Sequence, residues 1–326
     1  MITTHPDHPG LDHDAPIRTV GQLVASVSTR LHSENEGRWI VAQAATIAPA
    51  RILTVLDDPV SAETVEAVRV MVQRRTAGEP LQYILGTWSF RDLEVNVDPR
   101  ALVPRPETEQ VVEVALIELQ RLSRERGEAT DPLVAVDLGT GSGVIALSLA
   151  LEAVDAVRPS SASAGKATDI EIAVWATDVS LPALELARIN LAGLARRDAA
   201  AASRLTLAEG SWFDALPPRL AGHVHLVVSN PPYVSAAEWT VLDPEVRDHE
   251  PHNALVPGES GLEAIEILVD QARSWLAPGG VLVVELAPHQ AATVLSLAER
   301  AGYLDADVLP DLAGRARALT ARWPGA

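Results

Sequence analysis

The chain has 326 residues and a formal net charge of −18, and this acidic balance argues against a nucleic-acid substrate, whose binding surfaces are usually basic. It contains no cysteine, which excludes disulfides, thiolate zinc sites and a cysteine nucleophile. No apolar run approaches the ~18 residues of a membrane span, and the first residues lack the basic start and apolar core of a secretory signal. We therefore expect a cytoplasmic protein without a membrane contact, acting on a protein or a small molecule.

The first part of the chain is predicted to be helical. Residues 1–16 combine His, Pro and Asp without a pattern and are expected to form a disordered tail. Apolar residues then recur at helical spacing, and further helical stretches follow around 37–48 and 62–75. These stretches predict a small helical domain over residues 17–85. The residues on one face of its first helix are Ile17, Val20, Val24, Val27 and Leu31.

A short β-hairpin is predicted to follow, as a linker over residues 86–104. In "LEVNVDP", the apolar residues Leu93, Val95 and Val97 alternate with polar ones, which is the pattern of a half-buried strand. The preceding "TWSF" supplies the partner strand, and two prolines close the segment. A helix is expected to start near Thr108.

Strands and helices alternate in the rest of the chain. Such alternation predicts an α/β domain over residues 105–326, with a parallel sheet covered by helices on both faces. Two segments rich in Ala, Ser and charge, 158–168 and 196–203, are predicted to be surface loops. The expected strands are 133–138, 171–177, 205–208, 224–229 and 281–286, and the expected helices are 144–151, 182–192 and 262–276.

A glycine-rich turn joins the first of these strands to its helix, in "VAVDLGTGSGVIALSLA". Gly139, Gly141 and Gly143 let the backbone turn sharply and leave no side chain between it and a ligand. The turn lacks the Gly-Lys-Ser/Thr of a P-loop, which argues against a nucleoside triphosphatase. We interpret the turn, with Thr140 and Ser142, as a candidate cofactor site, although a glycine turn by itself is a weak signal.

Two further residues are expected at the same edge of the sheet. Asp178 ends the second strand, where a carboxylate accepts hydrogen bonds from both ribose hydroxyls of an adenosine. Trp212 follows the third strand, and its indole can pack on an adenine face. A strand-ending Asp can also simply cap the next helix, but the order of these residues on successive strands favours a nucleoside site. The cofactor is then NAD or S-adenosylmethionine.

The fourth strand ends in "SNPPY", which distinguishes between these two cofactors. The side-chain oxygen of Asn230 and the carbonyl of Pro231 can accept two N–H groups, and Tyr233 can stack on a flat group. This arrangement forms a clamp for a planar –NH2, which suits methyl transfer to an amide or an exocyclic amine but not hydride transfer. We therefore predict S-adenosylmethionine as the cofactor, and Asn230, Pro231, Pro232 and Tyr233 as catalytic and substrate-binding residues, with Asn230 also beside the cofactor. The alternative is a rigid turn without chemistry.

These motifs together resemble the bacterial release factor glutamine methyltransferases. The resemblance implies a Rossmann-like catalytic domain dependent on S-adenosylmethionine, which yields S-adenosylhomocysteine, and an N-terminal helical domain that docks the release factor. It also implies the substrate, which is the glutamine of the Gly-Gly-Gln loop of class 1 peptide chain release factors, methylated on its side-chain amide nitrogen. The motifs that carry the resemblance are "GEPLQYILG", "LVPRPETE", "DLGTGSGVIALSLA", "GSWFDAL", "SNPPYV", "EVRDHEPHNAL" and "DLAGRARALTAR".

The resemblance also implies further site residues. Phe90, Arg105, Pro106 and Glu107 would line the substrate site, beside the residues already named. No metal is expected, because the segment "DHEPHNAL" matches a family pattern and not a metal motif. The chain departs from the family at Ala316, where an Asp is usual, and at Ala287 near the end of "VELA", where a glycine often follows the Glu.

Other functions share parts of this pattern. The Asn-Pro-Pro-Tyr clamp also occurs in methyltransferases that act on DNA or RNA bases and on ribosomal-protein glutamine. The acidic balance argues against a DNA substrate. A non-catalytic adaptor for release factors is a further alternative, but it would need neither the glycine turn nor Asp178 nor Asn230.

Overall fold

The structure, a computed structural model, describes residues 17–127, 131–157 and 171–325. The described chain divides into two compact units, one ending at Leu85 and the other starting at Gly86. The predicted tail at 1–16 and the predicted loop at 158–168 lie outside the described residues. Each unit has its own hydrophobic core.

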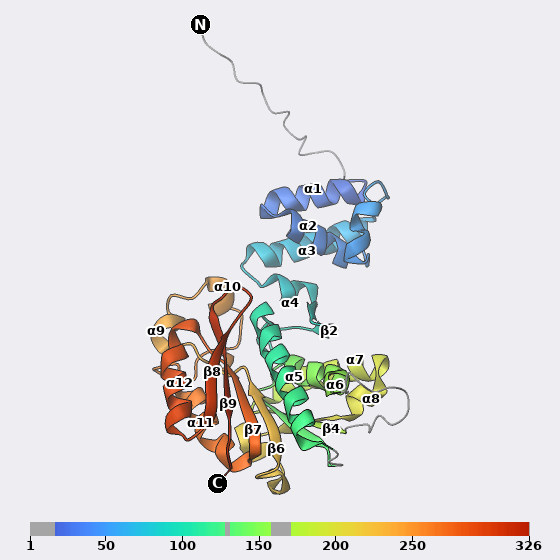
Figure 1. The fold of residues 1–326 in the computed structure, drawn as a ribbon. Coiled ribbons are helices and arrows are strands. Elements are labelled where there is room, and N and C mark those ends of the chain that lie inside the picture. The colour runs from blue at the N-terminus through green and yellow to red at the C-terminus, as the bar shows by residue number, and fades with distance from the viewer. Residues whose placement is uncertain (1–16, 128–130, 158–170, 326) are drawn as a thin grey trace. The chain divides into compact units, whose positions relative to one another are not determined.

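The first unit is helical, as predicted. A capping box starts its first helix, because Thr19 and Gln22 each satisfy a backbone N–H of the other. Val24 and Val27 of this helix pack with Ile40 and Val68 in a common core. The last helix was not predicted, because a helix of five residues is too short to show a period. The helices are α1 (Val20–Leu31), α2 (Glu34–Ala44), a short 3-10 helix (Pro49–Thr54), α3 (Ala62–Thr76) and α4 (Leu81–Leu85) (Figure 1).

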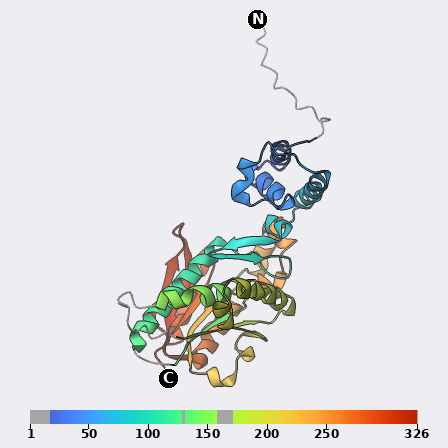
Figure 2. The same cartoon turned by 90° about the vertical axis from the view of Figure 1, so that its right-hand side faces the viewer.

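The second unit begins with the predicted hairpin, formed by β1 (Thr87–Phe90) and β2 (Leu93–Asn96). The strands are antiparallel, with Phe90 opposite Leu93. Leu93 and Val95 are buried while Glu94 is exposed, so the alternation in the sequence identified the buried face. The hairpin contacts two helices of the same unit, α6 (Val144–Val157) and α7 (Leu181–Arg197) (Figure 2).

A seven-stranded sheet, in strand order β5-β4-β3-β6-β7-β9-β8, forms the centre of the second unit in the part of the chain that the structure describes. Strands β3 to β7 run parallel to one another, as predicted, but β9 runs antiparallel to both β7 and β8. The expectation of a wholly parallel sheet was therefore wrong at this edge. No strand signal marked β8, because its residues are exposed or only half-buried. The strands are β3 (Leu133–Leu138), β4 (Ile172–Asp178), β5 (Leu205–Glu209), β6 (Val224–Ser229), β7 (Leu276–Glu285), β8 (Leu304–Pro310) and β9 (Ala316–Arg322).

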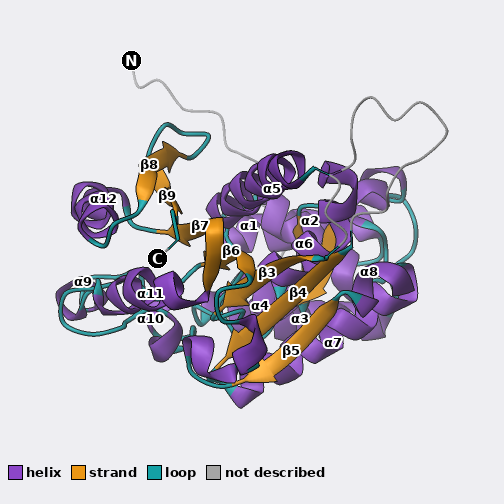
Figure 3. Cartoon of the chain, turned by 60° about the horizontal axis from the view of Figure 1, so that its bottom comes forward, coloured by secondary structure: helices purple, strands orange, loops and turns teal. Residues whose placement is uncertain are grey.

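Helices cover both faces of this sheet, which confirms the predicted α/β class. α5 and α6 lie on one side and α11 on the other (Figure 3). The segment 196–203 is not the surface loop that was expected, because α7 extends to Arg197 and α8 follows it. Its alanines favour a helix, and Ala201 and Ala202 are buried. The other helices of this unit are α5 (Pro106–Arg126), α8 (Ala199–Ser203), α9 (Ala236–Trp239), α10 (Pro244–Arg247), α11 (Glu263–Trp275) and α12 (Ala291–Arg300).

Among the described residues, no helix has the length and apolar character needed to cross a membrane.

Candidate active site

A cavity lies where the parallel strands β3, β4 and β6 end. The glycine turn follows β3, Asp178 ends β4 and Asn230 follows β6, and residues from all three contribute to the lining. Parallel strands bring their carboxyl ends to one edge, so this is the expected place for a ligand in such a sheet. The cavity has about 1040 Å³ of space free of atoms, its open mouth included. Trp212, Pro232, Thr108 and the segment 100–105 are among the other residues that line it.

The glycine turn has a backbone conformation that favours glycine. Gly139, Gly141 and Gly143 have φ values of 71°, 57° and 89°, in the left-handed region. Gly139 and Gly141 line the cavity, as do Thr140 and Ser142 between and beside them. Gly143 does not line it. A Cβ there would lie 3.3 Å from the side chain of Ala187 on α7, so this glycine permits close packing of α7 against the start of α6.

Two aspartates, the fully buried Asp137 and the half-buried Asp178, hold the turn in shape. Asp178 accepts hydrogen bonds from the backbone N–H groups of Gly141 and Ser180, each at 2.8 Å, and its carboxylate also lines the cavity. Burial raises the pKa of Asp178, and these two bonds oppose the rise. Asp137 is fully buried and accepts the hydroxyl of Thr140 at 2.6 Å, while burial raises the pKa of Asp137 to about 7. The cap of the next helix is Ser180, whose side chain accepts from the N–H of Ala183. Asp178 holds the backbone of this cap residue and that of the glycine turn, and it also lines the cavity, so a structural role and a ligand-facing role are compatible.

Trp212 forms a flat wall next to the glycine turn. Its φ of 47° is rare for a residue other than glycine, and such strain is common at functional sites. The hydroxyl of Thr177 donates a hydrogen bond to the Trp212 carbonyl at 3.0 Å, which helps to hold this backbone. A Cβ added at Gly139 would lie 3.4 Å from the indole ring, so the ring lies directly over the turn.

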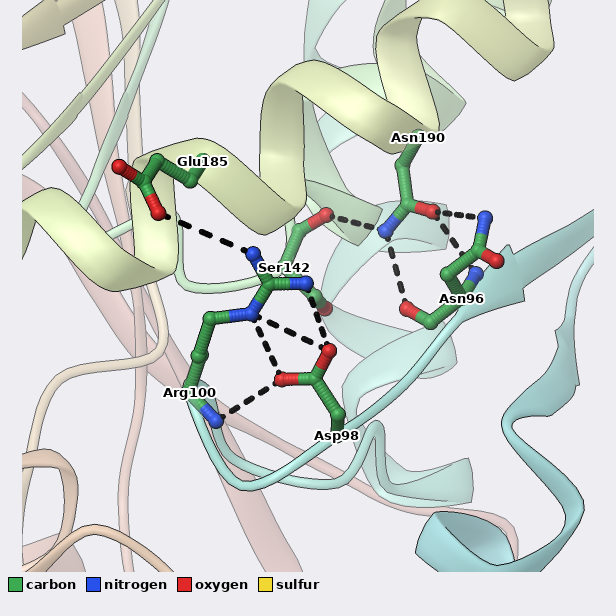
Figure 4. A network of polar contacts seen from close by, with 6 residues as sticks. All are labelled: Asn96, Asp98, Arg100, Ser142, Glu185 and Asn190. Atoms are coloured by element: carbon green, nitrogen blue, oxygen red, sulfur yellow. Dashed lines mark hydrogen bonds and ion pairs between the residues drawn. The ribbon is translucent and has the colours of Figure 1, made fainter.

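Asn190 of α7 connects the glycine turn to the hairpin, and the sequence did not single it out. Its side-chain oxygen accepts from the backbone N–H of Asn96 at 2.7 Å and from the Asn96 side chain at 3.0 Å. Its side-chain nitrogen donates to the carbonyls of Asn96 at 3.1 Å and Ser142 at 2.9 Å (Figure 4). Asn190 is only 5% exposed, so it fixes one end of the turn from inside the protein.

The segment that forms one wall of the cavity is held in the same way. Arg100 pairs with both carboxylate oxygens of Asp98, and its guanidinium lies 3.9 Å from Glu185 of α7 (Figure 4). The hydrogen bond from Arg100 lowers the pKa of Asp98. Further along the same segment, the backbone N–H of Val103 donates a hydrogen bond to Glu250 at 3.1 Å, and the guanidinium of Arg105 donates to Glu250 as well. These contacts fix the segment 100–105. The sequence had singled out only Arg105 in it, and none of the contacts that hold it.

Asn230 is held by a buried chain of hydrogen bonds. Its side-chain nitrogen donates to the hydroxyl of Thr108 at 3.1 Å, and this hydroxyl donates to Glu285 at 2.7 Å. Tyr233 donates its own hydroxyl to the other oxygen of Glu285 at 3.2 Å. Neither Thr108 nor Glu285 was predicted, since no local pattern links them to Asn230.

The residues expected to bind substrate have different positions. Arg105 and Pro232 line the cavity beside Asn230. Phe90 is 1% exposed in the hairpin, and Glu107 forms an ion pair with Arg315 at 3.0 Å. The described residues predicted for this site that do not line the cavity are Phe90, Pro106, Glu107, Pro231 and Tyr233.

The sequence is similar to a family model and to relatives that share one name. Residues 27–86 match the model of the PrmC N-terminal domain. A release factor glutamine methyltransferase from Cereibacter sphaeroides is 38% identical over 292 residues, covering 89% of this chain and 91% of that protein. A release factor glutamine methyltransferase from Streptomyces coelicolor is 42% identical over 253 residues, covering 77% of this chain and 79% of that protein. A solved methyltransferase from Pyrococcus furiosus has 17% identity and a TM-score of 0.46, covering 80% of this chain and 98% of that one.

Proposed function

Because the chain belongs to the family of release factor glutamine methyltransferases, we propose that it methylates a glutamine of peptide chain release factors on the side-chain amide nitrogen. S-adenosylmethionine is the proposed methyl donor, S-adenosylhomocysteine the product, and the glutamine of the Gly-Gly-Gln loop of class 1 release factors the proposed target. One observation carries the proposal for the site. Asn230 lines the same cavity as the glycine turn, Asp178 and Trp212.

The lining residues fit S-adenosylmethionine. The oxygens of Asp178 each retain a lone pair for a ribose hydroxyl, in addition to the backbone bonds that they accept. The indole of Trp212 offers a face for the adenine, and Gly139 and Gly141 keep side chains out of the ligand space. When bound, the cofactor supplies an electrophilic methyl group on a sulfonium.

The proposed work of the protein is to orient a poor nucleophile. An amide nitrogen reacts slowly because its lone pair is delocalised into the carbonyl. The side-chain oxygen of Asn230 and the carbonyl oxygen of Pro231 accept hydrogen bonds from the two N–H groups of the glutamine amide. These bonds direct the lone pair and stabilise the positive charge that develops on nitrogen. A strong base is not required, because the proton can leave after the transfer.

The two parts of the chain have separate proposed roles. We propose that the helical unit at 17–85 docks the release factor, that the hairpin region at 86–104 links it to the catalytic part, and that residues 105–326 carry the chemistry. The match of residues 27–86 to the N-terminal domain model supports an assignment of the helical unit to this family's own domain. Because the proposed substrate belongs to the translation machinery, we also propose a cytoplasmic location.

The decisive experiment combines the full chain with labelled S-adenosylmethionine and a purified release factor, followed by mapping of the labelled residue. We expect label on the glutamine of the Gly-Gly-Gln loop and none on a release factor with that glutamine changed to alanine. Label on the alanine variant, on ribosomal protein or on duplex DNA would contradict the proposed substrate. Calorimetry that detects no S-adenosylmethionine binding would instead favour an adaptor.

A further inference from the structure

We infer that Thr108 and Glu285 are positioning residues, which hold the Asn230 carboxamide in the one orientation that presents its oxygen to the substrate. The inference rests on the proposed function, in which that oxygen accepts an N–H of the substrate. Thr108 lies 122 positions from Asn230 in the sequence and is hydrogen-bonded to it directly. Glu285 lies 55 positions from Asn230 and is connected to it through the Thr108 hydroxyl.

The orientation follows from counting hydrogens. A threonine hydroxyl has one hydrogen, and an ionised carboxylate can only accept. Thr108 lies 2.7 Å from Glu285, so its hydrogen points to that carboxylate. The lone pairs of the Thr108 oxygen then face Asn230 at 3.1 Å and can bond only to a donor, which is the side-chain nitrogen. The side-chain oxygen of Asn230 is thereby left for the cavity.

Burial makes this arrangement firm. Thr108 is 2% exposed in the first turn of α5, and Glu285 is fully buried at the end of β7. Bulk water therefore has little access to replace either partner. Tyr233 donates to the second oxygen of Glu285 at 3.2 Å, so hydrogen bonds hold the carboxylate from two sides. Glu285 is thus the acceptor at the end of this series of hydrogen bonds.

The same hydrogen count predicts a response to pH. Burial raises the pKa of Glu285 to about 6, against the hydrogen bond from Thr108, the charge of Arg317 on β9 and the hydrogen bond from Tyr233, while the charge of Glu107 adds to the rise. Above this pH the carboxylate accepts from Thr108. As the pH falls through it, Glu285 binds a proton. A proton on the oxygen that faces Thr108 turns that oxygen into a donor, and the Thr108 hydroxyl is then free to donate to Asn230. The carboxamide then turns its oxygen inward and its –NH2 towards the cavity.

Thr108→Val and Thr108→Ser form the matched pair that tests the contact. Valine keeps the shape and removes the hydroxyl, so the carboxamide is no longer held. We expect single-turnover methyl transfer to slow roughly 10- to 100-fold, less than the roughly 10²–10³ for loss of a complete transition-state contact. Serine restores the hydroxyl and should recover most of the rate. S-adenosylmethionine affinity and thermal unfolding, measured on both variants, identify any loss that comes from misfolding.

Glu285→Gln tests the acceptor, because its amide oxygen can accept from Thr108 at every pH. The wild-type rate should fall on the acid side with an apparent pKa near 6, and this fall should be absent in the Gln variant. A second measurement needs no cofactor. The Asn230 side-chain amide signals in nitrogen–proton NMR of the full chain, assigned with Asn230→Ala, should shift with the same midpoint in wild type and not in Glu285→Gln.

The outcomes separate this inference from the proposed function. If Asn230→Ala is slow but Thr108→Val transfers methyl at the wild-type rate, the positioning role is wrong while the clamp stands. If Asn230→Ala itself transfers at the wild-type rate, the clamp fails. An acid limb that persists unchanged in Glu285→Gln, or amide signals that do not respond to pH in wild type, would also overturn the inference.

Discussion

Asn190 offers a sharp test of how the cavity is built. Its carboxamide satisfies three backbone groups, the N–H and C=O of Asn96 and the C=O of Ser142, at 2.7, 3.1 and 2.9 Å (Figure 4). Asn190→Ala removes all three bonds. Ser142 is buried, so leaving its carbonyl without a partner should cost about 1–3 kcal/mol of stability. Each of the two backbone groups of the half-buried Asn96 that lose a partner should cost about 0.5–1.5 kcal/mol. We expect a loss of about 2–6 kcal/mol in the free energy of unfolding.

Asn190→Asp is the more informative variant. It places a carboxylate oxygen where the nitrogen now donates, facing the carbonyls of Asn96 and Ser142. A protonated Asp can donate to one of them, so the folded state should raise the pKa of this carboxyl above its unfolded value. Since the folded state then binds more protons, the destabilisation is full above the raised pKa and shrinks as the pH falls through it. Asn190→Ala has no titratable group and should show no such recovery.

The assay is urea unfolding of both variants and wild type at pH 8 and pH 5, with S-adenosylmethionine affinity measured at each pH. The difference between Asn190→Asp and wild type should be smaller at pH 5. Because the glycine turn loses a support, cofactor affinity should fall in both variants. Wild-type stability in Asn190→Asp at pH 8, or a loss that does not change with pH, would refute this account of the network.

Three further predictions concern the cavity wall. Asp178→Ala should weaken S-adenosylmethionine binding by ~2–4 kcal/mol in calorimetry, because the proposed ribose acceptor is removed, and an unchanged affinity would remove Asp178 from the site. Asn230→Ala should raise the barrier of single-turnover transfer by ~2.7–4 kcal/mol with a much smaller change in cofactor affinity, and a wild-type rate would mean that the Asn-Pro-Pro-Tyr stretch is only a turn. Glu250→Gln should lower the free energy of unfolding by ~1–3 kcal/mol, because its new –NH2 must face a donor, either the N–H of Val103 or the guanidinium of Arg105. Denaturation at the wild-type midpoint would contradict that pairing.

Local features of the chain were predictable from the sequence. The strands β3 and β6 have the bounds that their apolar runs predicted, because a buried parallel strand needs apolar residues on both faces. The glycine turn was predictable because positive φ favours glycine. The place of Asp178 and Asn230 at one cavity was predictable because each lies at the carboxyl end of a strand, β4 and β6, and parallel strands bring these ends to one edge.

Partnerships between distant residues were decided only by the tertiary structure. Asn190 and Asn96 lie 94 residues apart, Glu250 and Val103 lie 147 apart, and Glu285 and Thr108 lie 177 apart. No short window of the sequence contains both members of such a pair, and neither member alone shows a pattern that identifies its partner. The antiparallel strand β9, which lies between β7 and the edge strand β8, was also decided by the tertiary structure, because its place depends on pairing with both. A sequence places side chains along one strand or helix, whereas a hydrogen bond between elements also requires the packing that sets their separation.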